Sequence, residues 1–363
     1  MEVLVAPEFW RGRRVFLTGH TGFKGSWLAL WLNELGAHVT GFALPPERPS
    51  LFEQARVGEV VKHREGDIRD PAAVEAAMRS CDPQVVFHLA AQPLVRRSYA
   101  EPRETFATNV QGTVNVLDAC RRMPSLKAIV AVTSDKCYEN REWAWPYREC
   151  DPMGGHDPYS ASKGAAELVI ASYRQSFFQG DGPLLASVRA GNVIGGGDWA
   201  QDRLIPDIVR AMIAGERVRI RSPHAVRPWQ HVLEALGGYL LIAQHLARGE
   251  RWAASAWNFG AAENDTRPVS WIVEQIVGLW GDGGFELDEG AHLPEANLLK
   301  LDCSKARSQL GWRLALNLSG ALQRIVDWHR SVAGGADPRA VTCEQLNEYR
   351  ALMDLAPGGE TLQ

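Results

Sequence analysis

Short apolar runs alternate with longer segments of helical periodicity through the first half of the chain. The apolar runs are continuous, which is typical of strands buried on both faces of a parallel sheet. The segments between them are long enough to cross over as helices from one strand to the next. This pattern predicts an α/β fold with a doubly wound, Rossmann-like parallel sheet. The expected strands are 14–19, 38–44, 84–91, 128–134 and 184–195, and the expected helices are 23–37, 71–81, 104–122 and 159–178.

The pattern loosens after residue 192, where a glycine-rich stretch leads into shorter strand-like and helical segments. This change predicts a smaller, interleaved C-terminal α/β lobe that binds the substrate. We expect residues 10–192 to form a dinucleotide-binding domain that also carries the catalytic residues. Residues 193–340 are expected to form mainly the substrate lobe, with some chain crossing back, and residues 341–363 to form a C-terminal extension that ends as a frayed tail.

Composition and charge exclude several classes of protein. The 363 residues are 45% hydrophobic and 23% charged with a net charge of -4, and no run of like charges suggests a nucleic-acid partner. The N-terminus lacks a signal-peptide pattern and no segment is long enough to span a membrane, so we expect a cytoplasmic protein. The six cysteines have no metal-ligand or redox spacing. We therefore expect them to be reduced, and we expect no metal site.

A glycine-rich loop follows the first expected strand in the segment TGHTGFKG, residues 18–25. Glycines at this point permit a tight turn, close approach of the backbone to a pyrophosphate, and close packing of the helix on the sheet. The amides at the start of the following helix are donors to the phosphates. The expected cofactor contacts in this loop are Gly19, His20, Thr21, Gly22, Phe23, Lys24 and Gly25.

Two residues of this loop depart from the usual fingerprints. His20 stands where GxGxxG has a glycine, and Lys24 stands where an aliphatic residue is common. Both departures are expected to put polar, potentially cationic groups beside the phosphates. They would either strengthen the phosphate contacts or weaken closure of the loop, and the sequence leaves both outcomes open.

The end of the second expected strand bears on the choice between NAD and NADP. It has no acid at Ala43, where an NAD enzyme often carries one for the ribose hydroxyls. Glu47 is either a substitute for that acid or a solvated loop residue, and the second interpretation is favoured. Arg48 is the only nearby basic residue that could bind the 2′-phosphate of NADP. NAD is therefore the predicted cofactor.

The segment VAVTSDK and the later segment YSASK carry the candidate catalytic groups. Tyr159 and Lys163 are four residues apart and share a helix face, so the ammonium can favour the phenolate and make Tyr159 a base. Ser134, Asp135 and Lys136 follow an apolar strand, at the carboxyl edge of the sheet where ligands bind in this architecture.

Together, the glycine loop and the Ser134, Tyr159 and Lys163 set resemble the extended short-chain dehydrogenases. This resemblance implies that Asp67 and Ile68 contact the adenine. It also implies that the segment HLAAQ lines the cofactor through Ala90, Ala91 and Gln92.

Within this superfamily, the presence of an acid directly after the serine resembles the pattern of the nucleotide-sugar 4,6-dehydratases. The Asp-Lys pair resembles the CDP-D-glucose 4,6-dehydratases, together with GHTGFKGSWL, PSLFE, HLAAQPLVRRSY, YSASKGAAEL, RAGNVIGGGDW and RPWQHV, over residues 10 to 330. The implied reaction converts CDP-D-glucose to CDP-4-keto-6-deoxy-D-glucose, an entry step toward the deoxysugars of bacterial surface polysaccharides. Asp135 is the expected proton donor to the 6-hydroxyl. Lys136 is either the base for the C5 proton or an electrostatic stabiliser of the enolate.

The resemblance also implies substrate contacts from the second half of the chain. Asn192 and Arg227 are expected at the diphosphate, while Arg203 and Pro206 lie in the segment that closes over the base. Helices near 103–122 and 157–178 are expected to pair across a two-fold axis, giving a homodimer or homotetramer. The alternatives are another NDP-sugar dehydratase, a 4-epimerase, or a catalytically silent NAD-binding regulator.

Overall fold

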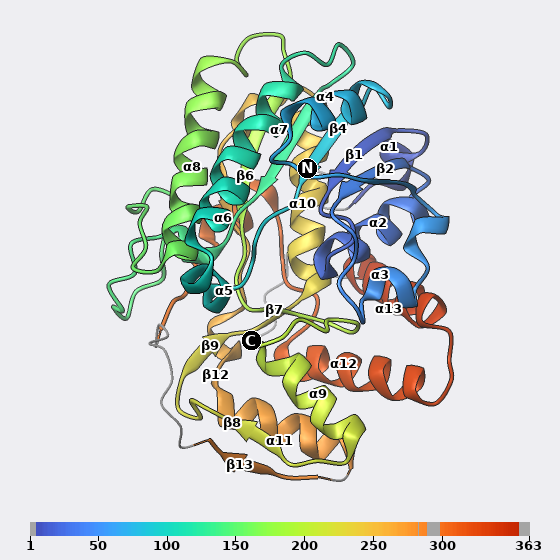
Figure 1. The fold of residues 1–363 in the computed structure, drawn as a ribbon, viewed down its shortest axis with the longest axis vertical. Coiled ribbons are helices and arrows are strands. Elements are labelled where there is room, and N and C mark those ends of the chain that lie inside the picture. Colours follow the sequence, from blue (N-terminus) through green and yellow to red (C-terminus); the bar gives the residue numbers. More distant parts are fainter. Residues whose placement is uncertain (1–4, 282, 289–297, 356–363) are drawn as a thin grey trace.

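The protein is built around a seven-stranded parallel sheet (Figure 1). The computed structural model describes residues 5–281, 283–288 and 298–355. The strand order is β11-β6-β5-β4-β1-β2-β3 and every neighbouring pair is parallel, which confirms the predicted fold class. The strands are β1 (Arg14–Thr18), β2 (His38–Ala43), β3 (Lys62–Glu65), β4 (Val85–His88), β5 (Ala128–Val132), β6 (Leu184–Arg189) and β11 (Ala256–Asn258).

Helices cover both faces of this sheet, and each face has its own hydrophobic core. One face is covered by α4 (Pro71–Arg79), α7 (Gly112–Cys120) and α8 (Pro158–Ser176), and the other by α2 (Phe23–Glu34), α10 (Val232–Ala247) and α13 (Pro338–Leu355). The shorter helices are α1 (Pro7–Trp10), α3 (Leu51–Gln54), α5 (Val95–Ala100) and α6 (Pro102–Phe106).

Helix α2 is buried along most of its length because α3, α10 and α13 pack against it in addition to the sheet. Its residues from Gly25 to Leu32 are all buried. The indole nitrogen of Trp27 donates to the carbonyl of Gly196 at 3.0 Å, and Trp31 packs edge-on against Tyr349. The start of the glycine-loop helix is therefore fixed by contacts from the second half of the chain.

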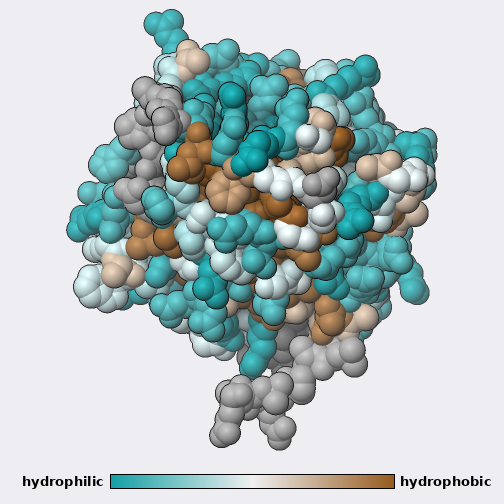
Figure 2. Space-filling model, turned by 90° about the horizontal axis from the view of Figure 1, so that it is seen from below, coloured by the Kyte–Doolittle hydropathy of each residue, from teal (hydrophilic) through white to brown (hydrophobic). Residues whose placement is uncertain are grey.

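A smaller group of elements lies below the sheet in Figure 1 and encloses a third core that includes Ile208, Ile272 and Leu322. Figure 2 shows the molecule from below, where hydrophilic side chains cover most of the face and hydrophobic ones gather near its middle. The helices are α9 (Leu204–Ala214), α11 (Val269–Trp280) and α12 (Leu318–Ala333). The short strands pair as β7 (Val193–Ile194) with β10 (Gln230–His231), β8 (Val218–Ile220) with β13 (Phe285–Leu287), and β9 (Val226–Pro228) with β12 (Thr266–Pro268).

The second half of the chain returns to the sheet through α10 and β11, and α13 packs on α2 and α3. The expectation of a frayed tail is wrong for residues 341–355, because these residues belong to α13 and bury Leu346 and Tyr349 against the core. The division of function at residue 192 stays a prediction.

None of the described helices is long and apolar enough to cross a membrane. All six cysteines are free thiols, as expected from their spacing. Among the described residues, no cluster of histidine, cysteine and carboxylate side chains is suited to a metal ion.

Candidate active site

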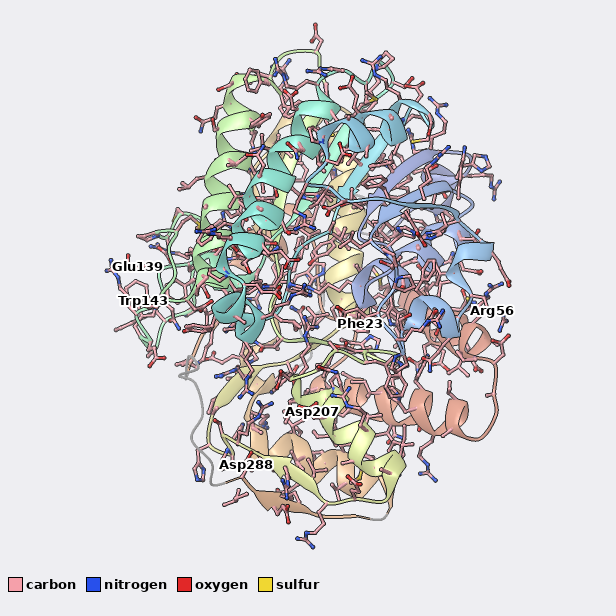
Figure 3. All side chains as sticks on the ribbon, viewed as in Figure 1. Phe23, Arg56, Glu139, Trp143, Asp207 and Asp288 are labelled. Carbon is pink, nitrogen blue, oxygen red and sulfur yellow. The ribbon has the colours of Figure 1, made fainter. Side chains whose placement is uncertain are left out.

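The carboxyl ends of β1, β4, β5 and β6 carry most of the predicted functional residues. The glycine loop follows β1, residues 90–92 follow β4, Ser134 follows β5, and Asn192 follows β6. Figure 3 labels Phe23, at the start of α2, and Asp207, on α9, on the two sides of the boundary between the sheet and the lower elements. Parallel strands thus bring segments far apart in sequence to one edge.

The glycine loop has the shape that a dinucleotide pyrophosphate requires. Gly19 adopts a positive φ of 77°, and a Cβ at this position would lie 2.7 Å from the amide nitrogen of Ala90. A Cβ on Gly25 would collide with the carbonyl oxygen of Gly19, so the helix can approach the loop only without a side chain there. Helix α2 starts at Phe23 and has no side-chain cap, which leaves its first amides as donors to an anion.

The two unusual loop residues behave differently from each other. The His20 ring is fully buried, with its Nε2 atom 2.7 Å from Nδ1 of His63 and its edge against Phe52. Burial, followed by the neighbouring His63, lowers the pKa of His20 to about 3. The expectation of a cationic group at position 20 is therefore wrong, because burial keeps this imidazole neutral.

Lys24 interacts electrostatically with the catalytic residues Asp135 and Lys163. Burial is the largest cause that lowers its pKa to about 8, and the Arg203 charge acts in the same direction. Asp135 and Asp198 act in the opposite direction, and Lys163 lowers the pKa further. Lys24 of the glycine loop thus interacts with the acid at position 135.

The remaining predicted cofactor residues line the loop side of the sheet edge. The amide of Ala90 donates to Thr18 Oγ1 at 3.2 Å, and Ala91 follows it in the same turn. Gln92 is buried, and its amide donates to Asn109 Oδ1 at 2.8 Å. At the next strand end, Ile68 is buried while the Asp67 carboxylate accepts from the Arg69 guanidinium and amide.

The end of β2 is apolar, as the sequence indicates. Ala43 is buried, and Glu47 beyond it is largely exposed and lies 3.9 Å from the Arg97 guanidinium. Arg48 pairs with Glu53 at 2.9 Å. Glu47 is thus placed as a solvated loop residue, which agrees with the favoured interpretation.

The segment after β5 turns sharply through the 3₁₀ turn η3 (Asp135–Cys137). The Ser134 hydroxyl donates to Asp135 Oδ1 at 2.8 Å, and the Lys136 amide donates to the same oxygen at 3.0 Å and to Ser134 Oγ at 3.2 Å. Ser134 and Asp135 are each 6% exposed. The turn therefore presents a hydroxyl, a carboxyl group and an amine from three consecutive residues.

Helix α8 brings Tyr159 and Lys163 against this turn. Asp157 caps the helix by accepting from the Ser160 amide, and Pro158 occupies its first turn. Burial raises the pKa of Tyr159 to about 12, although its hydrogen bond with Ser134 lowers it. Burial also lowers the pKa of Lys163 to about 8, against the opposing effects of Cys137 and Glu167. In this structure burial outweighs the expected stabilisation of the phenolate.

The predicted substrate residues of this part of the chain lie at the start of α9 and in the segment after β6. Arg203 is the N-cap residue of α9, pairs with Asp198 at 3.3 Å, and acts on the pKa of both Lys24 and Tyr159. Pro206 is buried in the first turn of the same helix. Asn192 has a positive φ of 48° and its carbonyl accepts from the Gln230 amide.

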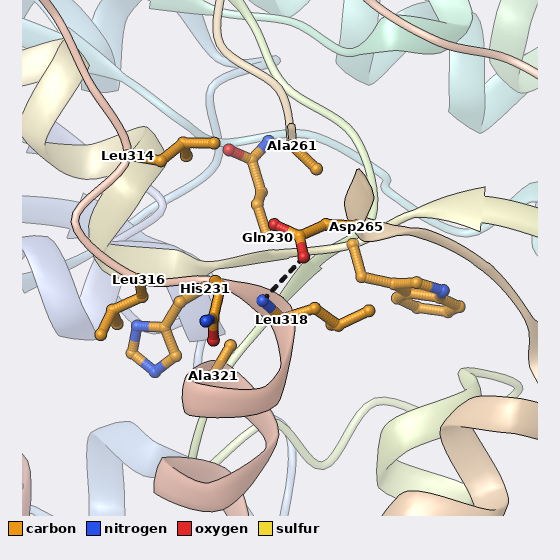
Figure 4. A pocket seen from close by; sticks show the side chains of 10 residues that line it. Gln230, His231, Ala261, Asp265, Leu314, Leu316, Leu318 and Ala321 are labelled. Carbon is orange, nitrogen blue, oxygen red and sulfur yellow. Dashed lines mark hydrogen bonds between the residues drawn. The ribbon is translucent and has the colours of Figure 1, made fainter. Parts of the chain in front are cut away.

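Arg227 lies in β9, paired with β12, and its guanidinium donates to the Val226 carbonyl at 3.2 Å. The neighbouring Trp229 and His231 line a small enclosed pocket, where the Leu318 amide donates to Asp265 at 3.0 Å (Figure 4). His231 also caps α10 by accepting from the Leu233 amide. Trp229 and His231 are both buried, and both act as packing residues.

The structure gives roles to three residues that lie within the quoted motifs but were assigned none there. Asp198 is buried beside Arg203. Glu167 and Arg189 form a buried ion pair behind the catalytic turn. One signal for Glu167 is present in the sequence, because it follows Lys163 by four residues and so shares its helix face.

Comparison with known proteins agrees with this geometry. The family described as GDP-mannose 4,6 dehydratase matches residues 16–325. The chain belongs to this family. The resemblance to nucleotide-sugar dehydratases in the motifs is therefore confirmed.

Two relatives of this chain are described as dehydratases of different nucleotide sugars. The chain is 51% identical over 353 residues to a CDP-glucose 4,6-dehydratase of Salmonella typhimurium, covering 95% of this chain and 98% of the relative. It is 30% identical over 268 residues to a dTDP-glucose 4,6-dehydratase of Streptomyces antibioticus, covering 73% and 75% of the two chains.

Solved structures share the fold at lower identity. A dTDP-glucose 4,6-dehydratase from Bacillus anthracis in complex with NAD has a TM-score of 0.75 at 22% identity, covering 90% of this chain and 100% of the other. A UDP-glucose 4-epimerase from Thermus thermophilus in complex with NAD has a TM-score of 0.75 at 24% identity, covering 87% and 99%. Dehydratases and epimerases thus share this scaffold, and residues at the site must separate them.

Proposed function

We propose that this protein is a CDP-D-glucose 4,6-dehydratase, a hydro-lyase that converts CDP-D-glucose to CDP-4-keto-6-deoxy-D-glucose and water. The observation that carries the proposal is the turn that holds Ser134, Asp135 and Lys136 against Tyr159. It occurs in a chain that is 51% identical to a CDP-glucose 4,6-dehydratase along 95% of its length. A 4-epimerase needs no proton donor for a 6-hydroxyl, so the acid beside Ser134 favours the dehydratase.

NAD is the cofactor that these residues fit. The uncapped start of α2 and the close-packed Gly19 and Gly25 provide the pyrophosphate site, and Ala90, Gln92 and Ile68 border it. Bound at this site, NAD would supply a reversible hydride acceptor for C4 oxidation and C6 reduction, and the complete reaction would be redox-neutral.

The chain's own residues supply the proton transfers. Tyr159, hydrogen-bonded to Ser134, takes the proton of the 4-hydroxyl. The Lys163 ammonium is proposed to stabilise the phenolate. The resulting 4-ketone acidifies the C5 proton. Asp135, in its protonated form, donates to the departing 6-hydroxyl, and Lys136, as a neutral amine, takes the C5 proton, so that the elements of water leave across C5 and C6.

Four residues outside the catalytic turn are proposed to bind the substrate. Arg203 is supported by its electrostatic contact with Lys24 and Tyr159, and a guanidinium binds phosphate oxygens well. Asn192, Pro206 and Arg227 are proposed to complete the nucleotide diphosphate site. We assign this role mainly to the lobe formed by residues 193–340, and cofactor binding to residues 10–192.

The protein is proposed to act as a homodimer or homotetramer. Residues near the expected two-fold axis include Phe106, which is 40% exposed, and Leu168 on α8, which is 64% exposed. Large exposed apolar side chains favour burial in an interface. Light scattering on the full chain should give the mass of a dimer or tetramer, and the 40.1 kDa mass of a monomer would contradict this proposal.

The activity is tested by incubating the purified protein with NAD and a panel of CDP-, dTDP-, UDP- and GDP-sugars. A 4-keto-6-deoxy product is recognised by its absorbance in alkali. The expected result is product from CDP-D-glucose without accumulation of NADH. Product from another nucleotide sugar alone would overturn the CDP assignment, and a C4 epimer would identify an epimerase. No product from any sugar would indicate a catalytically silent NAD-binding protein.

A further inference from the structure

A buried ion pair lies directly behind the catalytic turn. Glu167 on α8 and Arg189 at the end of β6 approach to 2.8 Å, and their side chains are 3% and 4% exposed. Among the ion pairs between described residues, this is the one in which both side chains are this deeply buried. Burying two charges is costly, so such a pair contributes little stability beyond what apolar side chains of similar volume would give.

The Glu167 carboxylate reaches the start of the catalytic turn. One oxygen accepts from the Thr133 hydroxyl at 2.5 Å, and the other accepts from Ser187 at 2.8 Å as well as from Arg189. Thr133 immediately precedes Ser134, and its amide donates to the Val188 carbonyl of β6. The carboxylate therefore fixes the residue from which the turn begins.

The Arg189 guanidinium reaches the other end of the same turn. It donates to the Tyr138 hydroxyl at 2.6 Å and to the Glu149 carbonyl at 3.1 Å. The Tyr138 hydroxyl in turn donates to Asn258 at 2.8 Å, which ties this end to β11. Residues 133 and 138 bracket the turn that carries Ser134, Asp135 and Lys136, and both are bonded to the one ion pair.

We propose that Glu167, paired with Arg189, is a positioning residue that fixes the Ser134–Lys136 turn against Tyr159 and places a negative charge on the helix face of Lys163. This inference rests on the proposed function. Glu167 lies one helical turn from Lys163 on the same face of α8, so a single carboxylate connects both parts of the catalytic set.

The charged and titratable groups that face Lys163 come from several elements. Cys137 of η3 and Glu167 of α8 raise the pKa of Lys163, while burial lowers it. Lys24 of α2 and His88 of β4 also interact with it, and both His88 and Lys24 have pKa values that this interaction lowers. Cys137 has a pKa raised well above its usual value and stays neutral, so Glu167 supplies the anionic charge.

The test replaces the ion pair without leaving a buried charge. The double variant Glu167→Gln with Arg189→Met removes both charges while keeping side chains of similar length. Glu167→Gln alone leaves Arg189 unpaired, so the double variant keeps the test valid if the single variant does not fold. Thermal unfolding establishes that each variant is folded before its activity is measured.

A matched control is available in α10. Glu234 is also a fully buried carboxylate, which accepts from the Leu316 amide at 2.7 Å and from Tyr349 at 2.9 Å, but it does not act on the pKa of Lys163. Burial raises the pKa of Glu234 to about 7, so above that pH Glu234→Gln also removes a buried negative charge and should leave the alkaline fall of kcat as in the wild type.

For the double variant we expect kcat to fall about 10- to 100-fold, because the turn is misplaced, with KM for CDP-D-glucose within about threefold of the wild type. The alkaline fall of kcat should move to lower pH, because Lys163 loses its facing anion. A folded double variant with wild-type kcat, or with an unmoved alkaline fall, would overturn the proposal. The wild type in the same assay separates the positioning role of Glu167 from the proposed function. An inactive wild type would contradict the proposed function and not the positioning role.

Discussion

Tyr159 and Lys163 share a buried helix face, and burial acts on both in the direction of the neutral form. It raises the pKa of Tyr159 to about 12 and lowers the pKa of Lys163 to about 8. The base therefore depends on nearby positive charge, and the lysine can lose its proton within the range in which enzymes are assayed. Catalysis at this site is expected to be sensitive to pH on the alkaline side.

This sensitivity can be tested with Lys163→Arg. We expect wild-type kcat to fall as the pH rises through about 8, where Lys163 loses its proton. Arginine stays charged, so the variant should be slower overall but should keep its activity above this pH. The measurement is kcat against pH under saturating cofactor and substrate.

Lys24→Met is the control for this experiment, because the pKa of Lys24 is also about 8. An alkaline fall that persists in Lys163→Arg and disappears in Lys24→Met would assign the titration to Lys24 and contradict our interpretation.

The role of Lys136 has its own test. If Lys136 takes the C5 proton, Lys136→Ala should lower turnover about 10²- to 10⁴-fold, the usual contribution of a general base. Substrate deuterated at C5 should then lose its label to solvent correspondingly slowly, as followed by mass spectrometry. Undiminished exchange at C5 would show that Lys136 is not the base.

At the scale of elements, the functional segments after β1 and β5 and in the first turns of α8 could be predicted from the sequence. Their residues have direct chemical roles. The glycines of residues 19–25 and the Tyr159 to Lys163 spacing carry their function in local sequence. The Glu167 and Arg189 pair could not be predicted from local sequence, since its members meet only when α8 packs on β6. Helix α13 was missed because its buried residues, Leu346 and Tyr349, are separated by polar positions typical of an exposed segment.

The docking of α13 can be tested at Tyr349. Its hydroxyl donates to Glu234 at 2.9 Å inside the core. Tyr349→Phe removes the donor and leaves one carboxylate oxygen without that partner, so we expect a loss of about 1–3 kcal/mol in the free energy of unfolding. Urea unfolding above pH 7 measures this change. Tyr99→Phe, at a tyrosine that is 44% exposed, should have little effect, and equal losses in both variants would contradict the assignment.

At the scale of the whole molecule, buried histidines make the fold sensitive to acid. Burial lowers the pKa of each to about 3 and keeps these side chains neutral. Between that value and about 6.5 the unfolded chain binds more protons than the folded chain, so stability falls as the pH decreases through this range. The four residues are His20, His88, His231 and His329.

We expect each of these histidines to cost about 2 kcal/mol of stability at pH 5 relative to neutral pH. His329→Met should therefore reduce the difference in unfolding free energy between neutral pH and pH 5 by about that amount, measured by urea unfolding. His224→Gln, at an exposed histidine, is the control and should leave the difference unchanged. An equal pH dependence in the wild type and His329→Met would contradict a neutral buried His329.

The central claim is that one site oxidises C4, eliminates water across C5 and C6, and reduces C6 of the same sugar. The most direct measurement uses CDP-D-glucose deuterated at C4, with NAD present, and locates the label in the product by NMR and mass spectrometry. The account predicts a 4-keto-6-deoxy sugar that carries the deuterium at C6, with no accumulation of deuterated NADH. Deuterium retained at C4 of an epimer, or released into free NADH, would contradict it.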